Sequence, residues 1–187
     1  MTKALFKIEE VEAGYQSPVI GPMSFTLQRS EVVGIWGPNG SGKSTILRAL
    51  TGSARVFGGR IERSPGMKLA YQQQHPVRLP VMPIRGSEFL RFMHAQCEPP
   101  PARLAALLDQ RIDRLSGGQF QLLCIWACLA GDADVVLLDE PTNNLDPANM
   151  TILTEILHDG PAGRSVLVVS HEHDFLATAC SRVLEVG

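Results

Sequence analysis

Residues 37–45 read Gly-Pro-Asn-Gly-Ser-Gly-Lys-Ser-Thr, and this stretch decides the fold. An apolar segment at 31–36 precedes it and predicts a buried strand. A helical apolar pattern follows over 43–51, and Gly52 is predicted to end that helix. Glycines let the backbone wrap tightly, so that its N–H groups face phosphate oxygens beside the positive end of the helix dipole. Strand, glycine-rich turn and helix together predict a P-loop that binds a nucleotide.

The residues of this loop have expected places against the phosphates, although a flexible Gly/Ser loop is the alternative interpretation. Lys43 is expected to reach the β- and γ-phosphates, and Ser44 is expected to ligate Mg²⁺. ATP and Mg²⁺ are therefore the predicted cofactors. The loop residues predicted to contact the nucleotide are Gly37, Pro38, Asn39, Gly40, Ser41, Gly42, Lys43, Ser44 and Thr45.

A second apolar strand is predicted at 135–138, and it ends in Asp139-Glu140. The acid that ends such a strand belongs in the Mg²⁺ site of an NTPase, and Asp139 is expected to hold the ion through water. Glu140 is expected to polarise an attacking water molecule. The alternative is a solvated acidic turn, but the apolar strand and the P-loop upstream favour the metal site.

Residues 115–119 read Leu-Ser-Gly-Gly-Gln, at the start of a helix predicted from Gly117 to Leu129. Ser116 by itself could be an ordinary N-cap. Two glycines in the first turn are each unfavourable by roughly 1 kcal/mol, and close approach of the backbone to a ligand would explain them. N–H groups at a helix start can hold an anion. A loop of this kind can complete a phosphate site that belongs to a second copy of the same domain.

The remaining pattern predicts a single α/β domain over 1–187. Apolar strands alternate with helices, which implies a mainly parallel sheet covered on both faces. The expected architecture is a P-loop NTPase with an N-terminal antiparallel β portion and a small inserted helical subdomain at about 75–116. Predicted strands lie at 4–11 (an edge strand), 23–27, 69–71, 165–169 and 182–186, and predicted helices at 86–97, at 102–110, after Pro147 and before the last strand.

Composition limits the environment of the chain. The net charge is −2 and no basic run occurs, so nucleic acid is not an expected partner. The 4 cysteines fit no disulfide framework, which favours a reducing, cytoplasmic location. The N-terminus lacks the apolar core of a signal peptide, and no apolar run approaches the roughly 20 residues that span a bilayer. A membrane is therefore expected to matter only through a partner.

Taken in order, the motifs resemble those of the ATPase subunit of ABC transporters over nearly the whole chain. The order is an early aromatic residue, the P-loop, a glutamine, Leu-Ser-Gly-Gly-Gln, the Asp139-Glu140 strand, the loop Asn-Asn-Leu-Asp at 143–146 and a histidine after a buried strand. The resemblance implies ATP hydrolysis that drives transport, with Mg²⁺ as cofactor.

The resemblance implies roles for three residues around one nucleotide. Tyr15 would stack on adenine, unless it is an ordinary turn tyrosine. Gln74 would touch Mg²⁺ and the lytic water, although Gln72 and Gln73 leave open which glutamine does so. His171 would contact the γ-phosphate; a histidine that follows a strand can also be purely structural.

The resemblance also implies two copies that close head-to-tail, as a homodimer or with a paralogous ATPase. Ser116 and Gly118 would meet the γ-phosphate bound by the other protomer, and Asp146 would shape the dimer interface. An integral membrane permease is the implied partner, which places the chain peripherally on the inner face of the cell membrane. The segment 76–90 is similar to the corresponding stretch of zinc/manganese importer ATPases.

Two alternatives remain at the level of sequence. Leu122 and Ala127 stand where the family has arginines, which motivates a nucleotide-gated interaction module that hydrolyses little ATP. The string Glu-Pro-Thr-Asn-Asn-Leu-Asp at 140–146 also occurs in soluble, translation-associated ABC proteins, so a soluble ABC ATPase is the second alternative.

Overall fold

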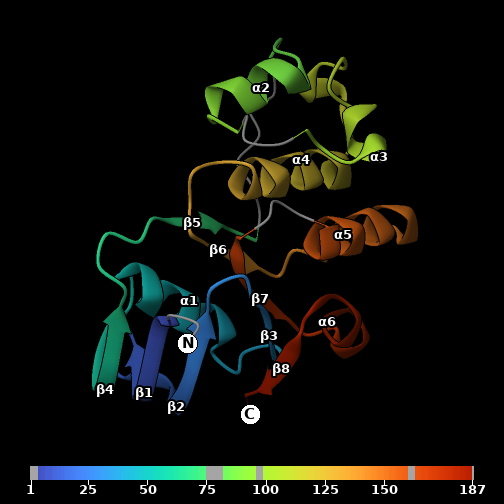
Figure 1. The fold of residues 1–187 in the computed structure, drawn as a ribbon. Coiled ribbons are helices and arrows are strands. Elements are labelled where there is room, and N and C mark those ends of the chain that lie inside the picture. Colours follow the sequence, from blue (N-terminus) through green and yellow to red (C-terminus); the bar gives the residue numbers. More distant parts are fainter. Residues whose placement is uncertain (1–3, 75–81, 96–98, 160–162, 187) are drawn as a thin grey trace.

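Two sheets build the molecule in a computed structural model that describes residues 4–74, 82–95, 99–159 and 163–186 (Figure 1). The larger sheet is parallel and has the strand order β5-β6-β7-β3-β8. The smaller sheet is antiparallel and has the order β2-β1-β4. The strands are β1 Ala4–Gly14, β2 Pro18–Gln28, β3 Val32–Trp36, β4 Arg55–Arg63, β5 Leu69–Gln72, β6 Val135–Asp139, β7 Ser165–Ser170 and β8 Arg182–Glu185.

Helices cover both faces of the larger sheet. The α1 helix lies between this sheet and the antiparallel sheet, whereas α4, α5 and α6 lie on the other side (Figure 1). The segment between β5 and α4 contributes α2, α3 and η1, of which α2 packs against α4. The helices are α1 Lys43–Thr51, α2 Gly86–Phe92, α3 Ala102–Ala105, the 3₁₀ helix η1 Ile112–Arg114, α4 Gly117–Leu129, α5 Pro147–Asp159 and α6 His173–Ala179.

Strand β6 shows why the parallel sheet forms. All of its residues are buried, and alternate side chains point to opposite faces. Val135 and Leu137 join the apolar cluster of α1 and the antiparallel sheet, while Val136 and Leu138 join the cluster of α4 and α5. A strand that is apolar on both faces needs cover on both faces. The predicted fold, a mainly parallel α/β sheet with an antiparallel portion, is confirmed.

The prediction for the N-terminal segment was wrong in one respect. Strand β1 is the central strand of its sheet, not an edge strand, because β4 pairs with its second side. The β4 sequence gave no clear strand signal, since it contains Gly58-Gly59 and most of its residues are exposed. Strand β2 is also longer than the predicted 23–27.

The helices predicted at 86–97 and 102–110 are shorter in the structure. Helix α2 ends at Phe92, and His94 has a positive φ of 54°. Helix α3 stops at Ala105, after which the amides of Leu107 and Leu108 donate to the carbonyls three residues earlier, at 3.0 Å each. The amides of Gly86 and Ser87 donate to the carbonyls of Gln110 and Leu108, at 3.0 Å each, and thereby satisfy the start of α2.

Helix α4 contains both residues that depart from the family pattern. Leu122 is 0% exposed and Ala127 is 2% exposed, and both belong to the core that includes Val136 and Leu138. The apolar side chains at these positions therefore fill the space under the parallel sheet. Core packing therefore accounts for apolar residues at the two positions where the family has arginines.

Replacing Leu122 with the arginine typical of the family is expected to destabilise this chain. Leu122→Arg would bury an unpaired charge, at a loss of about 3–5 kcal/mol in the free energy of unfolding. Thermal denaturation followed by circular dichroism should show a melting temperature lower by roughly 10 °C. Leu122→Met is the control and should stay close to wild type. An arginine variant as stable as wild type would contradict the packing described for α4.

Candidate functional site

The candidate site lies at the carboxyl edge of the parallel sheet. Neighbouring parallel strands end at the same edge, so the residues that follow them converge there. Glu140, His171 and Gly37 directly follow β6, β7 and β3, and Gln74 lies two residues after the end of β5. Segments that are far apart in the sequence thus meet at one place.

The P-loop connects β3 to α1 and lines a pocket of about 320 Å³, here called the P-loop pocket. Gly40 and Gly42 have φ angles of 85° and 91°, which favour glycine. A Cβ atom built at Gly40 would meet nothing within 4 Å, so the backbone there is open to an incoming group. The predicted loop residues that line this pocket are Asn39, Gly40, Gly42, Lys43, Ser44 and Thr45.

Lys43 and Glu140 form a buried ion pair in this pocket. The Lys43 ammonium donates to the carbonyls of Gly37 and Pro38 at 2.8 and 2.9 Å, and it lies 3.3 Å from Glu140 Oε1. His171 Nδ1 lies 2.9 Å from the other carboxylate oxygen, and its backbone N–H donates to that oxygen at 3.2 Å. Glu140 has a φ of 48°, an unfavourable conformation for a residue with a side chain. One carboxylate therefore joins the P-loop to the end of β7.

Ser44 also lines this pocket, and it contacts Asp139, which ends β6. The Ser44 hydroxyl donates to Asp139 Oδ1 at 2.7 Å, and the Tyr71 hydroxyl donates to Oδ2 at 2.7 Å. Burial raises the pKa of Tyr71 to about 12, and its hydrogen bond to Asp139 adds to the shift. A hydroxyl and a carboxylate are oxygen donors of the kind that Mg²⁺ prefers, so this pair fits the ion.

The structure separates the three consecutive glutamines. Gln74 lines the P-loop pocket. Gln72 is buried and accepts a weak hydrogen bond from the Cys128 thiol of α4 at 3.8 Å. Gln73 is exposed and is not among the residues that line the P-loop pocket. Of the three glutamines, Gln74 is the one that lines the P-loop pocket.

Tyr15 lies in the turn between β1 and β2 and is 48% exposed. Its hydroxyl accepts a hydrogen bond of 2.5 Å from Nη1 of Arg48, on α1. The hydrogen bonds to Tyr15 and Tyr71 raise the pKa of Arg48. Tyr15 therefore remains partly open to solvent.

Ser116, Gly118 and Asp146 do not line the P-loop pocket of their own chain. Ser116 caps α4: its Oγ accepts from the Gln119 N–H at 3.2 Å, while Gln119 Oε1 accepts from the Ser116 N–H at 2.9 Å. Asp146 caps the start of α5, where its Oδ1 accepts from the Asn149 N–H at 2.8 Å. Ser116 and Asp146 thus have hydrogen-bond partners within their own chain, as caps of α4 and α5.

The two glycines of α4 differ in their surroundings. A Cβ atom at Gly118 would lie 3.0 Å from Nδ2 of Asn149 and 3.1 Å from Cδ2 of Leu145, whereas one at Gly117 would meet nothing within 4 Å. Close packing against the turn and helix that follow β6 therefore gives a reason for Gly118 within the chain. Among the residues that the structure describes, no neighbour requires a glycine at position 117, so close approach of a ligand remains the predicted reason for Gly117.

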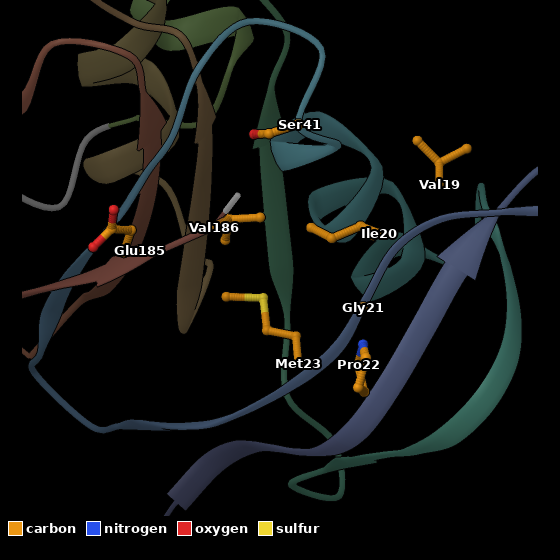
Figure 2. Close-up of a pocket in the computed structure, with 8 residues that line it drawn as sticks. All are labelled: Val19, Ile20, Gly21, Pro22, Met23, Ser41, Glu185 and Val186. Atoms are coloured by element: carbon orange, nitrogen blue, oxygen red, sulfur yellow. The ribbon is translucent and has the colours of Figure 1, made fainter.

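A second pocket, of about 370 Å³, lies behind the P-loop (Figure 2). Ser41 faces this pocket and not the P-loop pocket, and its Oγ has no hydrogen-bond partner among the described residues. The Ser41 N–H donates to the Pro38 carbonyl at 3.2 Å. The pocket is bounded by 19–23 of β2 and by Glu185 and Val186 at the end of β8.

Sequence reasoning missed four residues that belong to this region. Val19 of β2 lines the P-loop pocket, and Tyr71 and Arg48 are bonded to predicted site residues. Trp36 donates from Nε1 to the His171 carbonyl at 3.2 Å. Its ring and that of His173 are in a T-shaped arrangement, with 5.3 Å between the ring centroids. The only sequence signal was position, because Trp36 directly precedes the P-loop and Tyr71 ends the strand before Gln74.

A P-loop at the carboxyl edge of a parallel sheet, with an acid at the end of the neighbouring buried strand, defines a P-loop NTPase. Residues 20–143 match the family described as ABC transporter. The chain belongs to the ABC transporter family, and within it the chain is an ATPase subunit.

Relatives with printed names support this assignment. The zinc import ATP-binding protein ZnuC of Paracoccus denitrificans is 35% identical, over 93% of this chain and 72% of that protein. The protein of the same name from Cereibacter sphaeroides is 32% identical, over 89% of this chain and 72% of that protein. A transport ATPase is thus favoured over a soluble ABC protein and over a nucleotide-gated module with little hydrolysis.

Solved structures share the fold. CbiO1 of Clostridium perfringens, part of the ABC transporter complex CbiONQ, superposes with a TM-score of 0.76 at 23% identity. The match covers 98% of this chain and 84% of CbiO1. A structure described as the ATP-binding subunit of an ABC transporter gives a TM-score of 0.77 at 22% identity, over 97% of this chain and 85% of that one.

Proposed function

We propose that the chain hydrolyses ATP at the P-loop pocket, with Mg²⁺ held by Ser44, Asp139 and Gln74. The observation that carries this proposal is the Glu140 carboxylate, which bridges Lys43 and His171 beside the open loop at Gly40. Phosphate groups bound there would meet the N–H groups of the P-loop and the Lys43 ammonium. Bound Mg²⁺ supplies charge that stabilises the phosphate oxygens during transfer.

Each residue would then act on a defined group. Glu140 accepts a proton from the attacking water, which adds to the γ-phosphorus as the bond to the ADP oxygen breaks. Lys43 stabilises the charge that develops on the phosphate oxygens, and His171 holds Glu140 and approaches the γ-phosphate. Gln74 orients the water. Tyr15 presents its ring to adenine.

The second half of the proposal is a dimer. Ser116 and Gly118 lie at the start of α4, away from the P-loop pocket of their own chain, where the helix presents the positive end of its dipole. In a head-to-tail pair these two residues would reach the γ-phosphate bound by the partner, and Asp146 would lie near the seam. ATP contacts that exist only in the closed pair would shift the population towards it. The partner is a second copy or a paralogous ATPase.

We further propose that the chain docks on an integral membrane permease at the inner face of the cell membrane. No helix in the described part of the chain is long and apolar enough to cross a bilayer. The helical insertion, at about 75–116, would form the docking surface. Its residues 75–81 and 96–98 lie outside the described residues, but α2 carries Phe92, 73% exposed, and Met93 is 47% exposed.

The cargo we propose is zinc. The relatives of this chain are named as zinc import ATP-binding proteins. The similarity at 76–90 to zinc/manganese importers points the same way, although 76–81 lie outside the described residues. The cargo would bind the permease or a receptor, and among the described residues no group of three or more His, Cys, Asp or Glu side chains could hold a metal ion.

Glu140→Gln tests hydrolysis. The amide keeps the size of the side chain but cannot accept a proton, so phosphate release by the purified protein should fall by about a hundredfold or more. ATP binding should persist, measured by equilibrium titration. Lys43→Ala is the contrasting variant, because it should lose tight ATP binding. Equal hydrolysis rates in wild type and Glu140→Gln would remove Glu140 from the mechanism.

Ser116→Arg tests the dimer. The bulky cation would occupy the seam, so ATP-dependent dimerisation should be lost while ATP binding by the monomer persists. Size-exclusion chromatography with ATP in the Glu140→Gln background measures this. Ser116→Ala is the control, because it removes the same helix cap without adding bulk and should still dimerise. A normal dimer peak for Ser116→Arg would refute the proposed seam.

Zinc limitation tests the cargo. Cells that lack the chain are expected to grow normally in zinc-rich medium and poorly when zinc is chelated, because import would be lost. Added zinc should restore growth, and added manganese should not. Restoration by manganese alone, or growth that does not depend on zinc, would overturn the cargo assignment.

A further inference from the structure

The carboxylate of Asp139 is held from two sides. Asp139 is 3% exposed, and its oxygens accept one hydrogen bond each, from Ser44 and from Tyr71. Tyr71 pairs with Leu137 in the parallel sheet, so its side chain shares the face on which Leu137 and Asp139 lie. The Tyr71 ring packs on the apolar cluster that includes Leu137. The ring fixes the position of the hydroxyl, and the hydroxyl fixes Oδ2.

The Tyr71 hydroxyl gives its one proton to Asp139. Arg48, on α1, lies close enough to Tyr71 for its positive charge to act on that side chain, while its guanidinium donates to the Tyr15 hydroxyl at 2.5 Å. The hydrogen bonds that hold Asp139 itself therefore come from Ser44 of α1 and Tyr71 of β5, two segments that are distant from β6 in the chain.

We propose that Tyr71 is a positioning residue for the metal end of the site. Its hydroxyl holds Oδ2 of Asp139, so that Oδ1 stays directed at Ser44. This assignment rests on the proposed function, because it takes Ser44 and Asp139 as the residues that hold Mg²⁺. Without the Tyr71 hydroxyl the carboxylate can turn about its side-chain bonds, and metal affinity falls while nucleotide contacts of the P-loop remain.

Tyr71→Phe tests this role, because it deletes the hydroxyl and keeps the ring. The probe is Mn²⁺ as a spectroscopic substitute for Mg²⁺, titrated into the protein with the non-hydrolysable ATP analogue AMP-PNP and followed by electron paramagnetic resonance. The Mn²⁺ affinity should fall about tenfold or more, as expected for the loss of one hydrogen bond to a charged group. The affinity for AMP-PNP in EDTA should stay within about twofold of wild type, since no metal is involved.

Thr51→Val is the control. It removes a hydroxyl at the end of α1 that donates to the Arg48 carbonyl and lies outside the proposed site, so the Mn²⁺ affinity should equal that of wild type. Unchanged Mn²⁺ affinity in Tyr71→Phe would overturn the positioning role. An equal loss of AMP-PNP affinity with and without metal would also overturn it, because a general distortion has that effect. If wild type bound neither AMP-PNP in EDTA nor Mn²⁺, the proposed site itself would fail.

Discussion

The register of β6 against β7 is the constraint on which the candidate site depends. Asp139 pairs with Val169, and Ser170 pairs with Trp36, so three neighbouring strands end almost level. The residues that follow these strands, Glu140, His171 and Gly37, therefore converge. A slip of one residue would turn Asp139 to the opposite face of the sheet. The slip is prevented because β6 is buried on both faces, with different neighbours on each.

The convergence of these segments buries two opposite charges, those of Lys43 and Glu140, and each stabilises the other. Lys43 is 4% exposed and Glu140 is 6% exposed. A buried charge without a partner is unfavourable by several kcal/mol, and here each has the other, with two loop carbonyls and His171 completing the set. The Lys43 ammonium is therefore already removed from water. If a phosphate entered this pocket, Lys43 could pair with the phosphate in place of Glu140, with no further loss of hydration.

Much of the fold could be predicted from the sequence. The P-loop, the helix that ends at Gly52 and the strand that ends at Asp139 lie where the pattern put them, because consecutive residues set those backbone conformations. Gly52 adopts a φ of 80°, and its N–H donates to the carbonyls of Arg48 and Ala49. The ends of the helices after residue 86 could not be predicted from the sequence. They depend on hydrogen bonds between distant residues, such as the one that the Ser87 N–H donates to the Leu108 carbonyl.

The sequence by itself determined the class of this protein: a strand, a glycine-rich turn and a helix in succession, followed by motifs in a fixed order. These are properties of neighbouring residues, and local backbone preferences are sufficient to specify them. The tertiary structure alone decided that Tyr71 bonds Asp139, that Ser41 faces away from the P-loop pocket, and that Gly118 packs on Asn149. Those contacts join segments distant in the chain, and no spacing in the sequence encodes how far a side chain reaches across a sheet.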